Sequence, residues 1–355
     1  MPVVEVNGVR INYIQFPCES AIPAEDLIMV HGLATNLGFW YLSQATEFSK
    51  LYRITLYDLR GHGRSSIPES GYSVGNLAVD LRELLDCLGI PRAHFVAHSM
   101  GGAVALNLAC IDPARFASLV LLDTHISAAR LLPNEKWKFG EKIQRILSEN
   151  GVDIDVHEPY FGYKLLSAAA YLKLEGKRIS RELEELIGPL LGNSSKHTAG
   201  RWLKLVQTTQ AEEELMGDDG LSLEKLRQLR FPILAMYGER SQAMSTGERL
   251  LDLWPHADFR RIRDCGHFFP ITRPSEFMEN CRHFWNGARA HEVPHREGDF
   301  NRRYFRSERF YKRKGQWFFD TRESRENGPF HDLGEAKDHL WSQIVSDTAR
   351  EVHSN

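Results

Sequence analysis

Cysteine is scarce and irregularly spaced in this chain of 355 residues. The five cysteines are odd in number, none forms a CxxC pair, and they stand at positions 18, 87, 110, 265 and 281. Disulfide frameworks and zinc sites need paired or closely spaced cysteines, so we expect reduced thiols. Metal-ligand spacings, phosphate-binding glycine loops and cofactor signatures are also missing, so no metal and no cofactor is expected.

Long apolar runs and an excess of one charge are missing too. The N-terminal MPVVEVNGVRINYIQF has no basic stretch followed by an apolar one, and no apolar run reaches the roughly 18 residues that cross a membrane. A formal net charge of −3 gives no general attraction to nucleic acid or anionic lipid. We therefore expect a cytoplasmic protein without a membrane span.

Apolar runs alternate with helical patterns along most of the chain. Short β-rich runs at 3–5 and 9–15 flank Asn7-Gly8, which is typical of a hairpin turn. Helices are expected over 76–88 and 101–110. Further apolar runs, too continuous for half-exposed strands, lie at 27–30, 53–57, 94–97, 119–122, 233–237 and 258–262. The alternation predicts an α/β fold with a mostly parallel sheet.

One long segment departs from this alternation. Residues 126–225 are rich in Leu, Glu, Lys and Ala and contain no convincing strand. We expect a helical lid over one edge of the sheet, because insertions of this length are usually functional lids. The sheet domain is accordingly expected over 1–125 and 226–288.

A basic and aromatic segment follows the sheet domain. Within 296–314 eight basic residues stand against three acidic ones, and QWFFDTRESRENGPF resembles two strands around a turn. With a helix expected at 333–344, this predicts a small ββα module over 296–355, similar to accessory modules of bacterial proteins. Such composition can bind single-stranded nucleic acid or an acidic partner. A small sheet also needs aromatics for its own core, so we expect self-association or a protein partner rather than nucleic acid.

The strongest motif is HFVAHSMGG at 94–102, where an apolar run leads into Ser99 and directly into an Ala-rich helix. A nucleophile elbow has this context, because its serine sits on a strained strand-to-helix turn that only small neighbours allow. Ala97 replaces the first glycine of the G-x-S-x-G motif, and alanine is small enough for the turn. Ser99 is therefore the candidate nucleophile, with an ordinary strand–helix turn as the alternative.

Three further motifs supply partners for this serine. MVHGLATN at 29–36 follows a strand, and the backbone N–H groups of Leu33 and Met100 would form an oxyanion hole. DCGHFFP at 264–270 places His267 where a general base should come in chain order. YDLRGHGRSS at 57–66 is a tight loop expected to border the site. Because a serine hydroxyl needs an imidazole to accept its proton, Ser99 and His267 form the predicted pair.

In order and spacing, these four motifs resemble the α/β-hydrolase family over residues 3–285. The resemblance implies an α/β-hydrolase fold with an eight-stranded sheet and a helical lid, and it gives Ser99, His267, Leu33 and Met100 the same roles. In this family the acid that orients the histidine commonly lies three residues past the glycine of the strand after the lid. In ILAMYGERSQAM at 233–244 that position holds Ser241, which carries no full negative charge.

Three carboxylates could replace the missing acid. Asp123 ends the strand in LVLLDTH, from which some members of the family, such as haloalkane dehalogenases, supply their acid. Glu239 lies in the expected loop but two residues early, and Asp264 lies three residues before His267. We expect Asp123 to be the acid, with Glu239 as the alternative; Asp264 and a serine–histidine dyad stay open.

The substrate is expected to be a small or medium-sized apolar acyl or aromatic compound. Pocket candidates near the oxyanion loop, the elbow and the histidine are His31, Leu37, Phe39, Trp40, His98 and Phe268. A serine nucleophile favours acyl transfer to water, so the expected reaction is hydrolysis of a carboxylic ester or thioester through an acyl-enzyme. C–C bond cleavage of a diketone and a catalytically degenerate scaffold are the alternatives.

Overall fold

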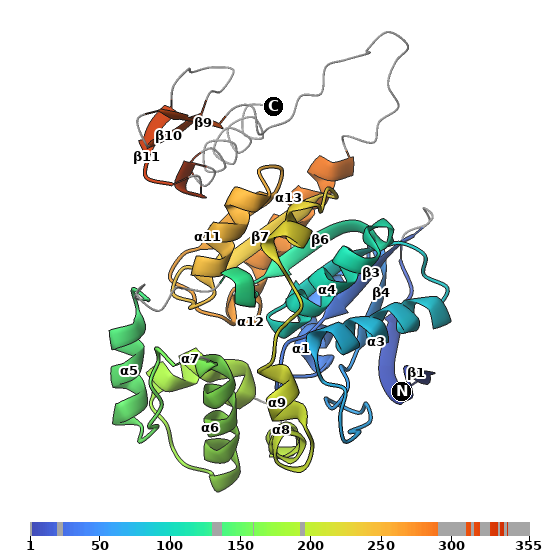
Figure 1. Ribbon diagram of the computed structural model, residues 1–355, viewed down its shortest axis with the longest axis vertical. Coiled ribbons are helices and arrows are strands. Elements are labelled where there is room, and N and C mark those ends of the chain that lie inside the picture. The colour runs from blue at the N-terminus through green and yellow to red at the C-terminus, as the bar shows by residue number, and fades with distance from the viewer. Residues whose placement is uncertain are drawn as a thin grey trace.

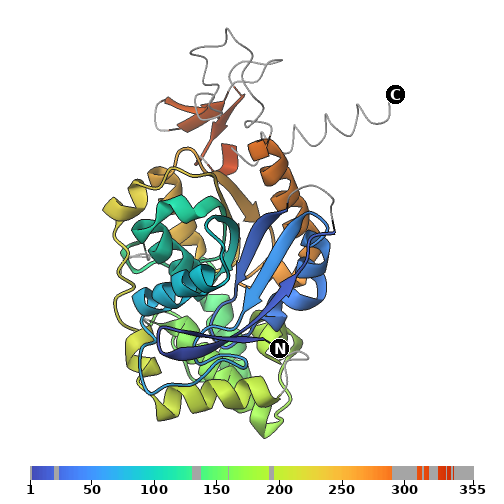
Figure 2. The ribbon, with the colours of Figure 1, turned by 90° about the vertical axis from the view of Figure 1, so that its right-hand side faces the viewer.

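A computed structural model describes most of the chain. The described residues are 2–19, 24–129, 137–158, 160–191, 196–289, 310–313, 316–319, 327–332, 334–336 and 339. Figures 1 and 2 show a sheet covered by helices on both faces, a group of helices at one end of the sheet and a small second sheet at the other end.

The core is an eight-stranded sheet in the order β1-β2-β4-β3-β5-β6-β7-β8. Its strands are β1 Val3–Val6, β2 Val9–Phe16, β3 Glu25–Val30, β4 Tyr52–Tyr57, β5 Ala93–His98, β6 Phe116–Leu122, β7 Ile233–Gly238 and β8 Asp258–Ile262. The pairs β1–β2 and β2–β4 are antiparallel, and all other neighbours are parallel. Every residue of β5 and β7 is buried, which explains their continuous apolar sequences. The predicted fold class is confirmed.

Two groups of helices cover the two faces of this sheet (Figure 2). On one face α3 (Val74–Cys87) packs against α4 (Met100–Ile111), which also contacts α10 (Leu223–Arg227). On the other face α2 (Thr46–Phe48) meets α13 (Pro274–Arg289). There the Phe48 ring packs edge-on against Phe277 and Trp285, with centroids 6.1 and 5.2 Å apart. The two layers enclose the sheet and leave the ends of its parallel strands free for loops.

The described chain between β6 and β7 is helical, as expected. Its main helices are α5 Gly140–Glu149, α6 Phe161–Glu175, α7 Arg181–Leu191, α8 Lys196–Thr208 and α9 Ala211–Leu215. Helix α6 packs against both α7 and α8. Asn36 Nδ2 donates a hydrogen bond to Thr198 Oγ1 at 3.4 Å, and Arg201 Nη2 donates to the Ser65 carbonyl. Helix α8 therefore lies over the loops that follow β3 and β4.

The C-terminal segment forms a separate antiparallel sheet. It consists of β9 Phe310–Arg313, β10 Gln316–Phe319 and β11 Asn327–Phe330, in the order β11-β10-β9. Strands β10 and β11 are the two predicted ones, and β9 adds a third from the basic stretch. Residues 334–336 and 339 are helical, while the rest of the predicted helix and residues 296–309 lie outside the described residues. Arg261 of β8 forms an ion pair with Asp332 at 3.4 Å.

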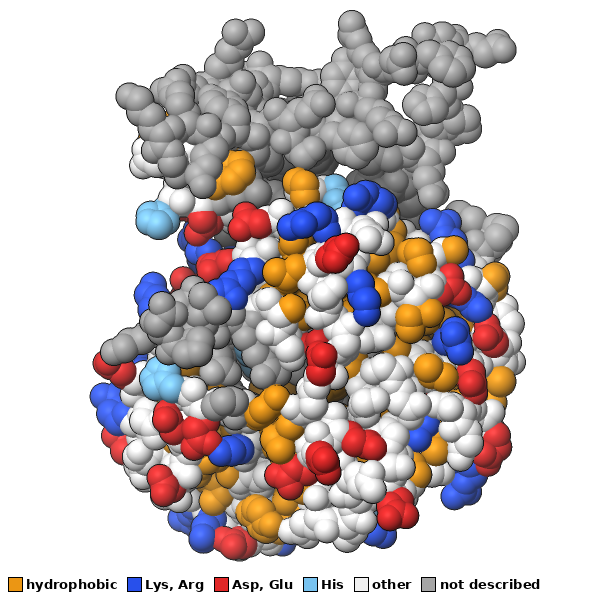
Figure 3. All heavy atoms as spheres, viewed as in Figure 1, with side chains coloured by type: hydrophobic (Ala, Val, Ile, Leu, Met, Phe, Trp, Pro, Cys, Tyr) orange, Lys and Arg blue, Asp and Glu red, His pale blue; other side chains and the backbone are white. Residues whose placement is uncertain are grey.

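Charge and hydropathy on the surface agree with the absence of a strong charge bias in the sequence. Acidic and basic side chains are interspersed over the face shown in Figure 3. Among the described helices, none combines the length and the apolar character needed to cross a bilayer.

Candidate active site

Ser99 lies on a strained turn between β5 and α4. Its φ of 56° and ψ of −124° place the backbone in a region that residues other than glycine rarely adopt. The turn fits because its neighbours are small: a Cβ atom on Gly101 would lie 2.5 Å from the His31 carbonyl oxygen, and one on Gly32 would lie 2.9 Å from Ser99 Cβ. Ala97, which replaces a glycine of the motif, is fully buried within β5. The turn therefore accommodates alanine at this position.

A chain of two hydrogen bonds leads from this serine to a buried carboxylate. His267 Nε2 lies 3.0 Å from Ser99 Oγ, and His267 Nδ1 lies 2.9 Å from Asp123 Oδ1. The neutral imidazole with its proton on Nδ1 satisfies both contacts, because Nδ1–H donates to the carboxylate and Nε2 accepts the serine proton. Three residues from separate loops, distant in sequence, thus meet in the arrangement that nucleophilic catalysis by serine requires.

Asp123 receives hydrogen bonds from the loop after β7. The Gly238 N–H donates to Oδ2 at 2.7 Å, and the Ser241 hydroxyl donates to Oδ1. Ser241 is itself held by the Ala243 N–H, which donates to Ser241 Oγ at 3.1 Å. Asp123 is completely buried, and its φ of 44° turns the chain away from β6 directly after the strand. The side chain at the position of the missing acid therefore binds the carboxylate that comes from the neighbouring strand.

The other two carboxylates point elsewhere. Glu239 Oε2 accepts a hydrogen bond from the Asp264 N–H at 3.0 Å. The Asp264 carboxylate forms an ion pair with Arg240 at 2.6 Å, and its side chain is 70% exposed. In the described part of the chain, neither carboxylate bonds to His267.

The backbone N–H groups of Leu33 and Met100 belong to residues near Ser99, because Met100 follows it directly and a Cβ atom on Gly32, next to Leu33, would lie 2.9 Å from Ser99 Cβ. Within the described residues neither N–H has a protein acceptor, and both residues are half-buried. The loop before Leu33 is fixed by His31, whose Nδ1 donates to the Gly32 carbonyl at 2.7 Å while Nε2 accepts from the Leu59 N–H at 3.1 Å. Burial lowers the pKa of His31 to about 4, so this imidazole stays neutral at neutral pH. The two hydrogen bonds of His31 thus connect the loop after β3 to the loop after β4.

The remaining pocket candidates form a packed layer beside the site. His98 Nε2 donates to the His267 carbonyl at 2.9 Å, and its ring stacks on Phe39 with centroids 4.9 Å apart. Burial lowers the pKa of His98 well below its usual value. Phe268 packs edge-on against His267 at 5.0 Å, and Trp40 is fully buried behind Phe39. These side chains orient the catalytic candidates; their contact with substrate stays a prediction.

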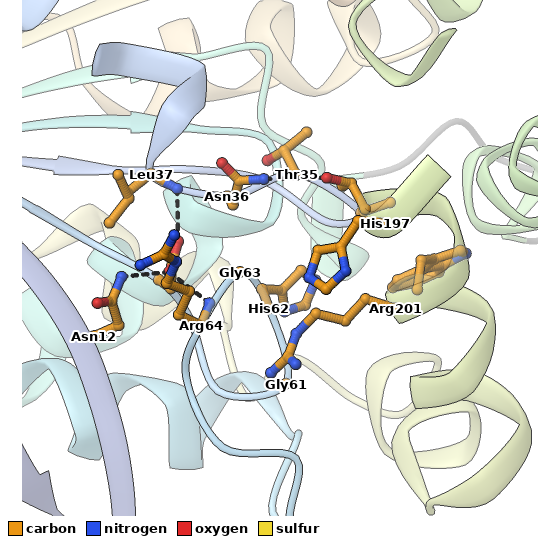
Figure 4. A pocket seen from close by; sticks show the side chains of 14 residues that line it. Asn12, Thr35, Asn36, Leu37, Gly61, His62, Gly63, Arg64, His197 and Arg201 are labelled. Atoms are coloured by element: carbon orange, nitrogen blue, oxygen red, sulfur yellow. Dashed lines mark hydrogen bonds between the residues drawn. The ribbon is translucent and has the colours of Figure 1, made fainter. Parts of the chain in front are cut away.

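A cavity of about 230 Å³ opens between the sheet domain and α8 (Figure 4). Its walls are Asn12, residues 34–37, Asp58, residues 61–64, and His197, Thr198, Arg201 and Trp202 of α8. Among the predicted pocket residues it includes Leu37. The loop at 57–66 was expected to border the site, whereas the contributions of α8 were missed. The hydrophobic pattern of the α8 sequence shows which face of the helix is apolar. It does not show which loop of the sheet domain that face contacts.

In the parts of the chain that the structure describes, no group of three or more His, Cys, Asp or Glu side chains is arranged to hold a metal ion. The five cysteines are free thiols, as the sequence indicated.

Comparisons with known proteins agree with the fold. The family model of the α/β hydrolase fold matches residues 27–274, and a model described as a domain of unknown function matches residues 295–344. The carbamate hydrolase RutD of Caulobacter segnis is 29% identical over 267 residues, covering 74% of this chain and 92% of that protein. The 3-oxoadipate enol-lactonase 2 of Acinetobacter baylyi is 36% identical over 137 residues, covering 39% of this chain and 49% of that protein.

Among solved structures, the N-acyl homoserine lactone degrading enzyme Est816 superposes with a TM-score of 0.58 at 25% identity, covering 80% of this chain and all of that one. The family model covers more than half of the chain, including β3 to β8 and the loops that carry Ser99, Asp123 and His267. The chain is therefore a hydrolase that belongs to the α/β-hydrolase family.

Proposed function

We propose that the protein hydrolyses a carboxylic ester or a lactone through an acyl-enzyme on Ser99. The proposal is carried by the two hydrogen bonds of 3.0 and 2.9 Å that join Ser99 Oγ, His267 and Asp123. In this proposal Ser99 is the nucleophile, His267 the general base and acid, and Asp123 the group that orients the imidazole.

The chemistry follows from these contacts. His267 Nε2 accepts the Ser99 proton as Oγ attacks the carbonyl carbon, and Asp123 stabilises the imidazolium that forms. The N–H groups of Leu33 and Met100 donate to the oxyanion of the tetrahedral intermediate. The imidazolium then protonates the leaving alkoxide, which in a lactone stays attached to the acyl chain. Water, deprotonated by His267, finally releases the acid and restores Ser99.

The relatives support the acyl class rather than one compound. A solved neighbour is named as a lactone-degrading enzyme, and a relative is named an enol-lactonase. A third protein is named a carbamate hydrolase, and its substrate would also present a carbonyl carbon to a nucleophile. The carbamate hydrolase covers 74% of this chain and the lactone-degrading enzyme 80%. Esters and lactones are therefore the first substrates to test.

We further infer that residues 126–225 act as a cap over the site. Helix α8 contacts the loop after β3 through Thr198 and Asn36, next to the proposed oxyanion donor Leu33. A cap in this position would exclude water and shape the substrate pocket.

The test compares wild type with Ser99→Ala on p-nitrophenyl acetate, p-nitrophenyl butyrate and a set of lactones. Loss of the nucleophile should lower kcat by at least about 10⁴-fold and abolish labelling by a fluorophosphonate probe. Ser148→Ala, on the exposed side of α5, should leave both unchanged and serves as the control. Labelling that persists in Ser99→Ala would overturn the assignment. If the protein hydrolyses carbamates but no ester or lactone, Ser99 remains the assigned nucleophile and the proposed substrate class is wrong.

A further inference from the structure

The cavity beneath α8 has a charge arrangement that the proposed hydrolysis does not use. Figure 4 shows Arg201 projecting from α8 toward the loop of Gly61 and Gly63, with Arg64 on the opposite wall. Residues 34–37 form a third wall and directly follow the proposed oxyanion donor Leu33. A group bound in the cavity would therefore lie beside the loop that faces Ser99.

Arg201 has hydrogen-bonding capacity that the protein leaves unfilled. Its Nη2 donates to the Ser65 carbonyl, and its buried Nε has no partner. A guanidinium has five N–H donors in a planar fork, so most of this capacity is unused. Within the described chain, no carboxylate lies within ion-pair distance of Arg201 or of Arg64. Burial lowers the pKa of Arg201, as expected for a partly desolvated cation.

Asp58 lines the cavity, but neutral donors already occupy its carboxylate. Its Oδ1 accepts from the Leu37 N–H at 2.8 Å, and its Oδ2 accepts from the Arg64 N–H at 2.8 Å and from Asn12 Nδ2 at 2.7 Å. The residue is 1% exposed beneath Gly63. Asp58 therefore organises the wall. Its charge raises the pKa of Arg201, but by less than burial lowers it, and within the described residues Asp58 forms no ion pair with Arg201 or Arg64.

His62, one of the two histidines in the lining, adds no positive charge at neutral pH. His62 is buried, its Nδ1 donates to the Arg60 carbonyl at 2.9 Å, and burial lowers its pKa to about 3. Apart from its two histidines, the lining carries two arginine charges against one aspartate. Holding a half-buried guanidinium without a counter-ion costs free energy, and a bound anion would remove that cost.

We propose that this cavity binds a carboxylate group of the substrate, with Arg201 as its main partner and Arg64 as a second. The planar fork of Arg201 matches the two oxygens of a carboxylate. Trp202 and Leu37, both nearly buried in the lining, provide apolar surface for the carbon chain between that carboxylate and the scissile bond. The preferred substrate is then an ester or lactone that carries a second, free carboxylate. This inference rests on the proposed function, because it concerns the same reaction.

The kinetic test compares matched esters that differ in one charge. We expect kcat/KM for p-nitrophenyl hemiglutarate to exceed that for its methyl ester, and Arg201→Gln should lower this ratio by about 10- to 100-fold. Arg201→Lys should give an intermediate ratio, since it keeps the charge and loses the fork. Lys204→Gln removes one positive charge from the exposed side of α8 and should leave the ratio unchanged. An equal loss on both esters, or no preference in wild type, would overturn the proposal.

A binding test separates this inference from the hydrolytic mechanism. In the Ser99→Ala background, glutarate at fixed ionic strength should raise Tm, and the rise should disappear when Arg201→Gln is added. Inorganic phosphate and acetate serve as comparison anions. If glutarate raises Tm but the wild-type protein hydrolyses no ester, the proposed function is refuted and the carboxylate site is retained. Equal rises with phosphate, or a rise that survives Arg201→Gln, would refute the site.

Discussion

In this protein the loops after β6 and β7 together position the carboxylate that contacts His267, whereas in this family the loop after the β7 strand commonly does so alone. The β6 loop carries the buried carboxylate of Asp123, which accepts hydrogen bonds from Gly238 at the end of β7 and from Ser241 in the loop after it. The strands are parallel neighbours, with Leu122 beside Met236, so their carboxyl ends open at the same place. In the proposed mechanism, what matters is therefore where the carboxylate lies relative to His267. A side chain from the end of either strand can reach that position.

The largest expected effect tests whether the β6 loop carries the acid. Asp123→Asn keeps the size of the side chain but removes its charge and presents an amide to His267 Nδ1. We expect kcat to fall by about 10⁴-fold, because the imidazole loses its orientation and its counter-charge. Ester hydrolysis measured on protein with an unchanged circular dichroism spectrum checks this. A fall of less than tenfold would end the assignment.

Moving the carboxylate to the β7 loop would sharpen the comparison. Ser241 Oγ already contacts Asp123 Oδ1, so Ser241→Asp should place an oxygen close to His267. In the Asp123→Asn background we expect Ser241→Asp to restore kcat by at least about 10-fold through the regained charge. The uncharged match, Ser241→Asn in the same background, should restore nothing. Equal activity of the two double variants would show that charge at this point is irrelevant.

Removing the support offered by the β7 loop should have a smaller effect. Ser241→Ala deletes one hydrogen bond to the Asp123 carboxylate and leaves the Ala243 N–H without its acceptor. We expect kcat to fall by about tenfold, the typical value of one hydrogen bond to a charged group. Ser245→Ala is the matched control in the same segment, since its hydroxyl donates to the Gln242 carbonyl rather than to Asp123, and it should retain full activity. Steady-state kinetics of both variants decide the point.

The smallest effect is expected at the carboxylate that remains in the β7 loop. Glu239→Gln keeps an oxygen able to accept from the Asp264 N–H, so neither structure nor kcat should change by more than about twofold. The same kinetic assay applies. A loss comparable to that of Asp123→Asn would reverse the roles assigned to the two loops.

Local patterns in the sequence were sufficient to predict the sheet. Continuous apolar runs identify strands buried on both faces, and β5 and β7 are such strands. The elbow was also predictable, because the requirement for small neighbours around Ser99 is visible in the chain itself. The pairing of Asp123 with His267 follows from chain order and from the resemblance; the catalytic roles stay predictions for the experiments above.

Other features depend on contacts that local sequence does not specify. The bond from Ser241 to Asp123 joins residues 118 positions apart, and a serine in a loop has no feature that marks its partner. The cavity arises where Arg201 of α8 meets the loop after β4, and the docking of a helical insertion leaves no periodic signal. Strand β9 was missed because its two charged residues, Lys312 and Arg313, obscure the alternation that marks a strand.

His98 links the assembly of the site to the folding of the sheet domain, because its contacts join segments that are far apart in the sequence. Its ring bonds to the His267 carbonyl across 169 positions and stacks on Phe39 of the segment after β3. Contacts between residues so far apart form late, since the loop between them must close first. The elbow, the oxyanion segment and the histidine loop are therefore joined by one imidazole only when both ends of the sheet domain have assembled. Hydrolytic activity during refolding should report the final closure of the domain, after most secondary structure has formed.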